Sequence, residues 1–453
     1  MVATVLRKLW ESAWLKRSGN SSSSSNNNNS SLPLGLGAFE SLPPDILMQI
    51  FHLLGPKDAA KLGLVCKSWR SLLSNDALWA HFLPHFALFA ETSLSLSSDY
   101  IPFQRVYALR ERLPASVIID GGSGYCKFGW SKDAAPLARV LTFLEFGNVE
   151  TPMYTRLCHF FGTIYTRMQV KPSSQPVVVS VPICHYDDTE SARASRQQLK
   201  EAIYTALFHM NVPAVCALNQ GTLALYAAQQ TSGISVNIGF QVTSVVPILN
   251  GKVMRKVGVE VVGLGALKLT GFLGEQMQQN NISFDSLYTV RTLKEKLCYV
   301  ASDYEAELLK DTQASFEAAE GLFTLSKERF QTGEILFQPR LAGVRAMGLH
   351  QAIALCMDHC YSAELSGNND WYKTVVLSGG TACLPGLAER LEKELHLLLP
   401  PHESNGIRVV PPPYGEDTAW FGAKIIGSLS TFPGPWCTTK KQFRQKSKHN
   451  RSW

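Results

Sequence analysis

The stretch SVIIDGGSGYCKFGW, from Ser116 to Trp130, reads as two short β-strands joined by a glycine-rich turn. Its β-branched run ends at Asp120, and three glycines fall within the next four positions. Glycine lets the backbone turn tightly and approach an anion, so successive amide groups can surround a phosphate, and Lys127 adds a positive charge. The stretch lacks the GxxxxGK[ST] pattern of a Walker loop. A phosphate-binding hairpin and a plain tight β-turn therefore remain alternative interpretations of these residues.

A second stretch, GISVNIGFQVTSVVPI from Gly233 to Ile248, has the same strand-turn-strand pattern around a glycine. Its turn carries no acidic residue. Carboxylates are the groups that hold a hydrated divalent cation beside phosphates. The pattern therefore predicts that only the first hairpin is equipped for a nucleotide phosphate.

Around these hairpins, strand-like runs alternate with helical segments from residue 114 onward, and one such segment is ESARASRQQLKEAIYTALFHM, residues 190–210. This alternation is typical of an α/β domain. The predicted strands are SVIID (116–120), PVVVSVPI (176–183), GISVNIG (233–239), TSVVPIL (243–249) and TVVLSGG (374–380).

A smaller helical unit precedes this domain. Residues 18–31, SGNSSSSSNNNNSS, are a polar low-complexity tract that we expect to be disordered. After it, apolar residues at helical spacing predict three short helices over 39–83, separated by Gly55-Pro56 and by Ser74-Asn75-Asp76. So small a unit offers more apolar surface than it can bury internally, so it either binds a partner or packs as a cap on the large domain. The second predicted helix carries Leu62, Val65, Cys66, Trp69 and Leu72.

The composition is that of an ordinary soluble globular protein, since 45% of the 453 residues are hydrophobic and 18% are charged. No apolar run approaches the roughly 18 residues that a membrane span requires. The first seventeen residues, MVATVLRKLWESAWLKR, mix apolar and basic residues at helical spacing. They predict a frayed amphipathic helix, with a membrane-surface or targeting segment as the alternative.

The ten cysteines form no CxxC pair, which indicates a reducing cytosolic or nuclear setting. In AMGLHQAIALCMDHC, residues 346–360, two histidines and two cysteines are conceivable zinc ligands. Buried thiols are common in apolar helices, however, so an ordinary core helix is the preferred interpretation.

The formal net charge of +6 is concentrated at the C-terminus, because the last eighteen residues hold six Lys or Arg and no acid. The charges of the rest of the chain are balanced, so a general nucleic-acid-binding surface is not indicated outside this tail. We expect a flexible basic tail that is either a plain solvated terminus, a nuclear import signal or a contact to nucleic acid.

The residues of the small unit closely resemble an F-box. The resemblance implies that it docks onto the Skp-type adaptor of an SCF ubiquitin ligase and performs no chemistry itself. The matching positions are Leu42-Pro43-x-Asp45-Ile46-Leu47, Asp58, Leu62, Val65-Cys66-x-x-Trp69-Arg70 and Leu78-Trp79. The adaptor contacts that it implies are Leu42, Pro43, Ile46, Leu47, Ile50, Val65 and Trp69.

The larger domain resembles actin, beginning with Asp120-x-Gly122-Ser123-Gly124-x-x-Lys127 in the first hairpin. The resemblance implies an actin-like α/β fold of two lobes, with ATP between two phosphate hairpins and a divalent cation reached through carboxylates. Further matching segments are TLKEKLCYVASDYEAE (292–307), GEILFQPRLAG (333–343), VVLSGGTACLPGLAERL (375–391) and FGAKIIGSLSTF (421–432).

The actin resemblance also implies which residues face a nucleotide. Gln220 matches a glutamine that positions the attacking water. The positions implied to face the phosphates are Asp120, Gly122, Ser123, Gly124, Tyr125 and Lys127. Those implied to face the adenosine are Arg291, Lys294, Glu295, Gly379 and Gly380.

Departures from actin cluster in the second hairpin. Asn237 and Phe240 replace two aspartates, Ser244 replaces a histidine and Gln241 replaces a glycine. An amide and a phenyl ring cannot hold a hydrated cation as carboxylates do. Leu384 and Glu416 replace a tyrosine and a lysine near the base. We therefore expect weak or no Mg²⁺ binding and slow or absent hydrolysis, while ATP binding and an empty cleft remain alternatives.

The expected organisation has a disordered start (1–38), an F-box (39–83), a connector (84–113), an actin-like domain (114–436) and a basic tail (437–453). Only about forty residues separate Pro136 from the strand at Pro176, roughly half of what actin uses. The small subdomain of actin is therefore expected to be truncated, which argues against filament formation.

These features predict an interaction protein rather than an enzyme: an F-box subunit that recruits the ligase and captures an unidentified protein substrate. One alternative is an ATP-driven conformational switch. Another is a nuclear structural role in chromatin complexes, with the basic tail supplying import or DNA contact. We expect no membrane partner, and a location in the nucleus, with the nucleolus as one candidate, and in the cytoplasm.

Overall fold

The computed structural model describes residues 42–82, 104, 115–142, 151–182, 189–255, 260–362, 371–429 and 431–449. The chain divides into two compact units, residues 1–78 and 79–453, which are treated separately. The predicted N-terminal helix, the low-complexity tract and nearly all of the predicted connector lie outside the described residues. No helix in the described part is long and apolar enough to cross a membrane.

The first unit is built from short helices: α2 (Pro44–Leu54), α3 (Pro56–Leu62) and α4 (Lys67–Leu73), followed by α5 (Asp76–His81). The second helix predicted from the sequence is thus wrong, because it is broken in two. Cys66 has an extended backbone, with φ of −152°, and its thiol accepts a hydrogen bond at 3.4 Å from the Trp69 amide, which starts α4. Apolar spacing alone does not reveal such a break.

Within this unit the aromatic rings of Phe51 and Trp69 meet edge to face, with centroids 5.8 Å apart. The buried apolar side chains of the unit are Leu47, Phe51, Ala59, Trp69, Leu73 and Leu78. The helices therefore share an internal core that includes two of the predicted adaptor contacts.

The larger unit contains a first sheet in the order β14-β5-β4-β1-β2-β3. Its strands are β1 (Val117–Gly121), β2 (Tyr125–Trp130), β3 (Ala138–Leu141), β4 (Val177–Val181), β5 (Ala214–Asn219) and β14 (Thr438–Thr439). β1, β4 and β5 are parallel, and the remaining pairs are antiparallel.

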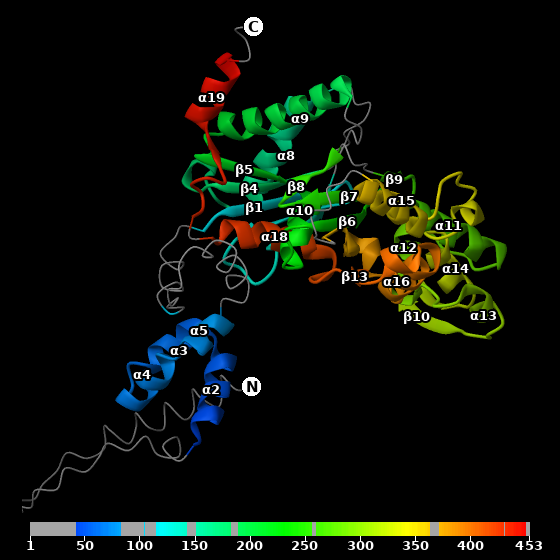
Figure 1. Ribbon diagram of the computed structural model, residues 1–453, viewed down its shortest axis with the longest axis horizontal. Coiled ribbons are helices and arrows are strands. Elements are labelled where there is room, and N and C mark those ends of the chain that lie inside the picture. Colours follow the sequence, from blue (N-terminus) through cyan, green and yellow to red (C-terminus); the bar gives the residue numbers. More distant parts are fainter. Residues whose placement is uncertain are drawn as a thin grey trace, which may run out of the picture. The chain divides into compact units, whose positions relative to one another are not determined.

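Both faces of this sheet are covered, as buried parallel strands require. In Figure 1, α8 (Met153–Arg167) and α9 (Glu190–His209) lie on one side of β1, β4 and β5, and α18 (Thr418–Gly427) lies on the other. Side chains alternate accordingly: Val117 and Ile119 pack towards α8 and α9, whereas Ile118 packs with Leu223 and Trp420.

The second sheet has the order β13-β12-β6-β7-β8. Its strands are β6 (Gly233–Ile238), β7 (Thr243–Leu249), β8 (Lys252–Val253), β12 (Thr374–Ser378) and β13 (Arg408–Val410), and β9 (Glu260–Val262) pairs with β7. Helices α11 (Ala266–Gln279), α15 (Leu349–Ser362) and α16 (Leu387–Leu398) share its main hydrophobic core.

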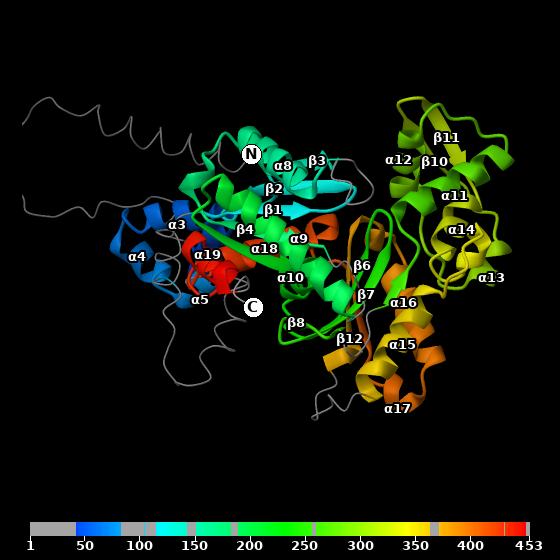
Figure 2. The same cartoon turned by 90° about the horizontal axis from the view of Figure 1, so that it is seen from above.

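Helix α10 (Gln220–Ala227) joins the two sheets, because it contacts β4 and β5 of the first and β6, β7 and β12 of the second. The predicted α/β fold is confirmed, as are the helix at 190–210 and all five predicted strands. The remaining elements, many of them visible in Figure 2, are α12 (Leu287–Leu297), α13 (Tyr304–Leu308), β10 (Ala314–Ala318), β11 (Gly321–Leu325), α14 (Glu328–Glu334) and α17 (Pro401–Ser404). Short 3₁₀ turns lie at Pro172–Ser174, Pro339–Ala342, Trp371–Lys373, Gly380–Cys383 and Gly415–Asp417.

The C-terminal segment is not the flexible tail that its composition suggested. Thr438 and Thr439 pair with β5 as strand β14, and α19 (Lys440–His449) follows. The ring of Phe443 stacks on Tyr204 of α9, with centroids 5.5 Å apart. The Lys440 ammonium group also donates a hydrogen bond at 2.9 Å to Asn211 Oδ1, just after α9, so the segment is held by strand pairing, by one aromatic ring and by one lysine.

Candidate nucleotide-binding site

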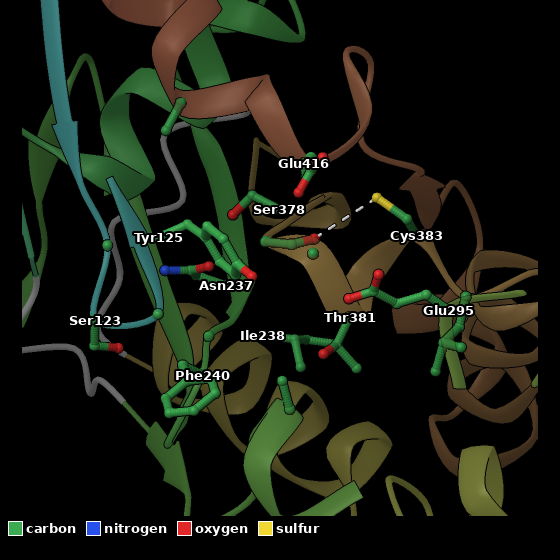
Figure 3. Close-up of a pocket in the computed structure, with 18 of the residues that line it drawn as sticks. Ser123, Tyr125, Asn237, Ile238, Phe240, Glu295, Ser378, Thr381, Cys383 and Glu416 are labelled. Atoms are coloured by element: carbon green, nitrogen blue, oxygen red, sulfur yellow. Dashed lines mark hydrogen bonds between the residues drawn. The ribbon is translucent and has the colours of Figure 1, made fainter. Parts of the chain in front are cut away.

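A cavity of about 440 Å³ opens where the β1–β2 turn, the β6–β7 turn and the end of β12 meet. Its size is in the range of small-ligand pockets. Figure 3 shows Ser123 towards one end and Glu295 and Cys383 towards the other. The structure brings together here all eleven residues that the actin resemblance assigned to a nucleotide: Asp120, Gly122, Ser123, Gly124, Tyr125, Lys127, Arg291, Lys294, Glu295, Gly379 and Gly380.

Asp120, near the end of β1, is buried, and its carboxylate accepts two side-chain hydrogen bonds. Its Oδ1 atom accepts hydrogen bonds from the Ser180 hydroxyl at 2.5 Å and from the Gln220 amide at 3.1 Å. Gln220 Oε1 in turn accepts a bond from the Asn237 amide at 3.5 Å. This chain of polar groups connects the first sheet, α10 and the second sheet beneath the cavity.

Lys127, on β2, is also buried, at 8% exposure. Its ammonium group donates to the Glu416 carbonyl oxygen and lies 3.8 Å from Asp417 Oδ1. Arg139 forms ion pairs with the carboxylates of the same two acidic residues. The positive charge that the sequence assigned to a phosphate is thus already opposed by a buried carboxylate.

At the other end, Arg291 lies over the ring of Tyr125, with its guanidinium carbon 4.4 Å from the ring centroid. It also donates to the Tyr125 hydroxyl and, at 2.8 Å, to Glu295. Arg291 and Glu295 project from α12 and Tyr125 from β2, so this contact joins the first sheet to α12 across the cavity.

Lys294 is buried among neutral groups. Its ammonium group donates to the Ala266 carbonyl at 3.2 Å and to the Thr270 hydroxyl at 3.0 Å. Burial lowers the pKa of Lys294 to about 8, with a smaller opposing effect from the nearby Glu295 carboxylate. An anionic ligand beside this buried ammonium group would stabilise its protonated form.

Gly379 follows β12 with φ of +93°, a conformation that glycine tolerates. A Cβ atom there would lie 2.3 Å from the Ile238 carbonyl oxygen and 2.7 Å from Asn237 Oδ1. Only glycine therefore lets the end of β12 meet the end of β6. By contrast, a Cβ atom on Gly380 would meet nothing within 4 Å, so the cavity is open beside it.

Thr381 and Cys383 are among the cavity residues that the sequence did not single out. Thr381 is 5% exposed, lines the cavity, and its hydroxyl has no hydrogen-bond partner. Cys383 lines it as well, and its thiol lies 3.8 Å from the Gly379 carbonyl oxygen, as Figure 3 shows. Their position directly after Gly379-Gly380 could have predicted this, because the residues that follow a ligand-binding turn commonly line the same cavity.

The fit to a nucleotide is uneven along the cavity. The orphaned Thr381 hydroxyl, the open space at Gly380 and the buried Lys294 suit an organic phosphate compound. At the second hairpin the fit to a divalent cation is poor, because Asn237 offers an amide and Phe240 a phenyl ring. Within the described residues no group of three His, Cys, Asp or Glu side chains is arranged to hold a metal ion.

In the small unit, some of the predicted adaptor contacts are buried in the core and others are exposed. Leu47 and Trp69 are in the core, at 6% and 8% exposure, so they stabilise the unit and are not available to a partner in this conformation. Leu42 and Ile50 are half-buried, and Pro43 is exposed. The large apolar side chains that are exposed are Ile46 (38%), Leu53 (80%), Leu64 (77%) and Val65 (51%).

Comparison with known proteins accounts for this architecture. The actin family model matches residues 160–292 and 275–448, more than half of the chain. The chain belongs to the actin family. It is 63% identical, over 98% of its length and 99% of the relative's, to "Actin-related protein 8" of Arabidopsis thaliana. The protein of the same name from Oryza sativa subsp. indica is 59% identical over 99% of this chain and 98% of its own length.

Within the actin family, the chain thus groups with the plant actin-related protein 8 sequences. An F-box-like model matches residues 39–85, which confirms the F-box resemblance of the small unit. The actin match runs to residue 448 and so includes α19.

Proposed function

We propose that this actin-family protein is a recruitment subunit of an SCF-type ubiquitin ligase, whose F-box-like unit binds a Skp-type adaptor. The observation that carries the proposal is the F-box-like match combined with four large apolar side chains left exposed on so small a unit. Large apolar surface left exposed on a small unit is typical of a protein interaction site. In this role the actin-like domain presents a protein substrate, whose identity stays open.

The proposed test is binding of the purified full chain to a Skp-type adaptor, measured by calorimetry. Val65→Asp and Leu64→Asp change exposed side chains, so the F-box-like unit keeps its core while its surface gains a charge. We expect each variant to weaken adaptor binding at least tenfold. Leu309→Asp, at a side chain 90% exposed in the larger unit, is the matched control and should bind normally. No complex with the unchanged chain would refute the proposal.

We further propose that the cavity holds a nucleotide without hydrolysing it efficiently. Gln220, the residue matching the water-positioning glutamine, has its amide committed to Asp120 and its carbonyl oxygen to Asn237. A side chain held in this way is not free to orient a water molecule. Phosphate release at the rate of a buffer blank, in the presence of a bound nucleotide, is the expected result.

The rival nuclear role rests on a separate observation, the exposed Lys441 and Arg444 of α19. Under that proposal, neutralising both residues abolishes salt-sensitive DNA binding. Under recruitment by the F-box-like unit, the same double variant leaves adaptor binding unchanged.

A further inference from the structure

Phe240 lies in the β6–β7 turn and contacts the first hairpin. A Cβ atom built on Gly124 would lie 3.1 Å from the Cβ, Cγ and Cδ2 atoms of Phe240. The two turns that would have to separate around a phosphate are therefore in van der Waals contact through this side chain. Figure 3 shows Phe240 on the same side of the cavity as Ser123.

The backbone holds Phe240 in this position. Its carbonyl oxygen accepts a hydrogen bond at 2.8 Å from the Leu267 amide at the start of α11, and the preceding Gly239 carbonyl accepts one from Ala266 at 2.9 Å. A Cβ atom on Gly265 would lie 2.6 Å from the Phe240 carbonyl oxygen. The turn is packed against α11, which fixes the backbone that carries the ring, so the ring can leave Gly124 only by rotating about its own side-chain bonds.

The charges around the cavity are balanced. The Lys, Arg, Asp and Glu side chains that line it are three basic groups, Lys127, Arg291 and Lys294, and three acidic groups, Asp120, Glu295 and Glu416. A nucleoside triphosphate carries about four negative charges and depends on a divalent cation to offset them. This lining has no excess positive charge, and Asn237 and Phe240 offer no anionic ligand for such a cation.

We propose that Phe240 makes this cavity selective for a nucleoside diphosphate, bound without a divalent cation, over a triphosphate. The inference rests on the proposed nucleotide site. The intact turn at Gly122, Ser123 and Gly124 receives the shorter phosphate chain, and the contact between Phe240 and Gly124 excludes the third phosphate. Phe240 is thus a specificity-determining residue.

The experiment measures binding of ADP and ATP to the full chain by calorimetry, each with Mg²⁺ and with EDTA. We expect the unchanged protein to bind ADP at least tenfold more tightly than ATP, with less than a twofold effect of Mg²⁺. Phe240→Ala removes the ring and should reduce the ADP preference at least fivefold. Phe240→Leu keeps apolar bulk beside Gly124 and should retain the preference, and thermal unfolding of each variant confirms that it is folded.

The outcomes separate this inference from the proposed site. Equal or tighter binding of Mg²⁺-ATP by the unchanged protein overturns the selectivity while leaving the nucleotide site in place. An unaltered ADP-to-ATP ratio in Phe240→Ala removes the role of the ring. Absence of binding by both nucleotides to every variant would sink the nucleotide site and this inference together. Binding to Phe240→Ala alone shows that the ring closes the cavity entirely and refutes the diphosphate assignment.

A different observation, at the C-terminal segment, carries a second inference. Thr438 pairs with Val215 in the antiparallel β14–β5 ladder, so the next position places Cys437 opposite Cys216. Opposed residues in antiparallel strands have Cα atoms about 4.5–5.5 Å apart, within the range that a disulfide needs. Cys216 is buried and Cys437 is half-buried.

We infer that Cys216 and Cys437 form a disulfide when the protein meets a peroxide. The two thiols lose two hydrogen atoms and two electrons, and one hydrogen peroxide is reduced to two water molecules. Hydrogen bonding to Cys216 and burial raise the pKa of the Cys437 thiol, so the reaction speeds up with rising pH. The disulfide would link the segment that carries β14 and α19 covalently to β5.

Peptide mapping after treatment with hydrogen peroxide tests this inference. We expect a linked pair of peptides containing residues 216 and 437, and no such pair in Cys437→Ser. Cys383→Ser removes an exposed thiol in the nucleotide cavity and should leave the linkage intact. Recovery of Cys216 and Cys437 as unlinked thiols, or as separately oxidised residues, would overturn the inference.

Discussion

The side-chain amide of Asn237 donates a hydrogen bond at 3.5 Å to Gln220 Oε1, where the actin resemblance places a metal-facing aspartate. Gln220 donates in turn to Asp120 at 3.1 Å. An amide at position 237 is therefore the partner that this glutamine needs. The loss of charge at the second hairpin comes with a new polar connection between the two sheets.

Asn237→Asp should weaken that connection. The new carboxylate would face Gln220 Oε1, and both groups are hydrogen-bond acceptors. To donate to this carboxylate, the Gln220 amide would have to give up its bond to Asp120. Loss of one such buried bond costs about 1–2 kcal/mol of unfolding free energy, which urea denaturation measures. Asn405→Asp, at an exposed side chain, should cost nothing measurable. Because Phe240 remains, we expect no Mg²⁺-stimulated phosphate release from Asn237→Asp, and its appearance would contradict this explanation of the site.

Arg390 and Glu334 form an ion pair inside the second lobe, at 3.2 Å and with a fully buried Glu334 carboxylate. Arg390→Met should lower the unfolding free energy by about 3–5 kcal/mol, because the carboxylate loses its charge partner in a buried setting. The double variant Glu334→Gln/Arg390→Met should recover part of the loss. Arg340→Met changes an exposed arginine and is the control for chemical denaturation. Equal losses in the single and double variants would show that the charge of Glu334 is unimportant.

Lys294 makes stability depend on pH in a defined direction. Its pKa is about 8 in the folded protein, against an ordinary value of 10.5. Between these values the unfolded chain binds the proton that the folded protein has lost, so unfolding free energy rises as pH increases through this window. Below pH 8 Lys294 is protonated in both the folded and the unfolded protein, so this gain in unfolding free energy is absent. Urea denaturation from pH 7.5 to 10 should show this rise relative to Lys294→Met, and parallel curves for the two proteins would rule it out.

Leu47→Ala tests the division between core and surface in the F-box-like unit. Because Leu47 is 6% exposed, truncation should cost about 2–5 kcal/mol and increase hydrogen exchange across residues 44–73. Leu53→Ala, on the same helix but 80% exposed, should leave exchange unchanged. If both variants behave alike, the assignment of Leu47 to the core is wrong.

Phe443→Ala should release the C-terminal segment. The ring lies 5.5 Å from those of Tyr204 and Phe208, and these are its aromatic contacts in the described residues. Removing a partly buried phenylalanine costs about 2–3 kcal/mol locally, so hydrogen exchange over residues 438–449 should accelerate while the rest of the domain is unaffected. Lys441→Ala, at an exposed side chain, is the control.

Much of the fold and cavity was predictable from the sequence, because the deciding signals are local. The glycine-rich turn after Asp120 and the Gly379-Gly380 pair end two buried strands, and strand ends on neighbouring sheets converge on the cavity. The replacements at Asn237 and Phe240 came from the actin resemblance, which says what stands at those positions in actin. Their contacts did not, since the bond to Gln220 and the packing on Gly124 depend on how two distant hairpins meet.

Other features lie beyond such signals. Apolar spacing marks Leu47 and Val65 alike, and only the packed unit shows that one is buried while the other is exposed. The break between α3 and α4 depends on the extended backbone of Cys66, in a stretch whose apolar spacing is still helical. The docking of α19 depends on Phe443 and on the bond from Lys440 to Asn211, and a basic, polar composition hides the anchoring ring.

Strand β14 has a consequence for assembly. The edge of a sheet exposes backbone groups to which a strand of another molecule can be added, and proteins protect such edges against aggregation. Here the chain covers Ala214 and Val215 of β5 with its own Thr438 and Thr439. A strand from another molecule must displace β14 before it can pair with β5. Strand β14 therefore protects this edge of β5 from intermolecular strand addition.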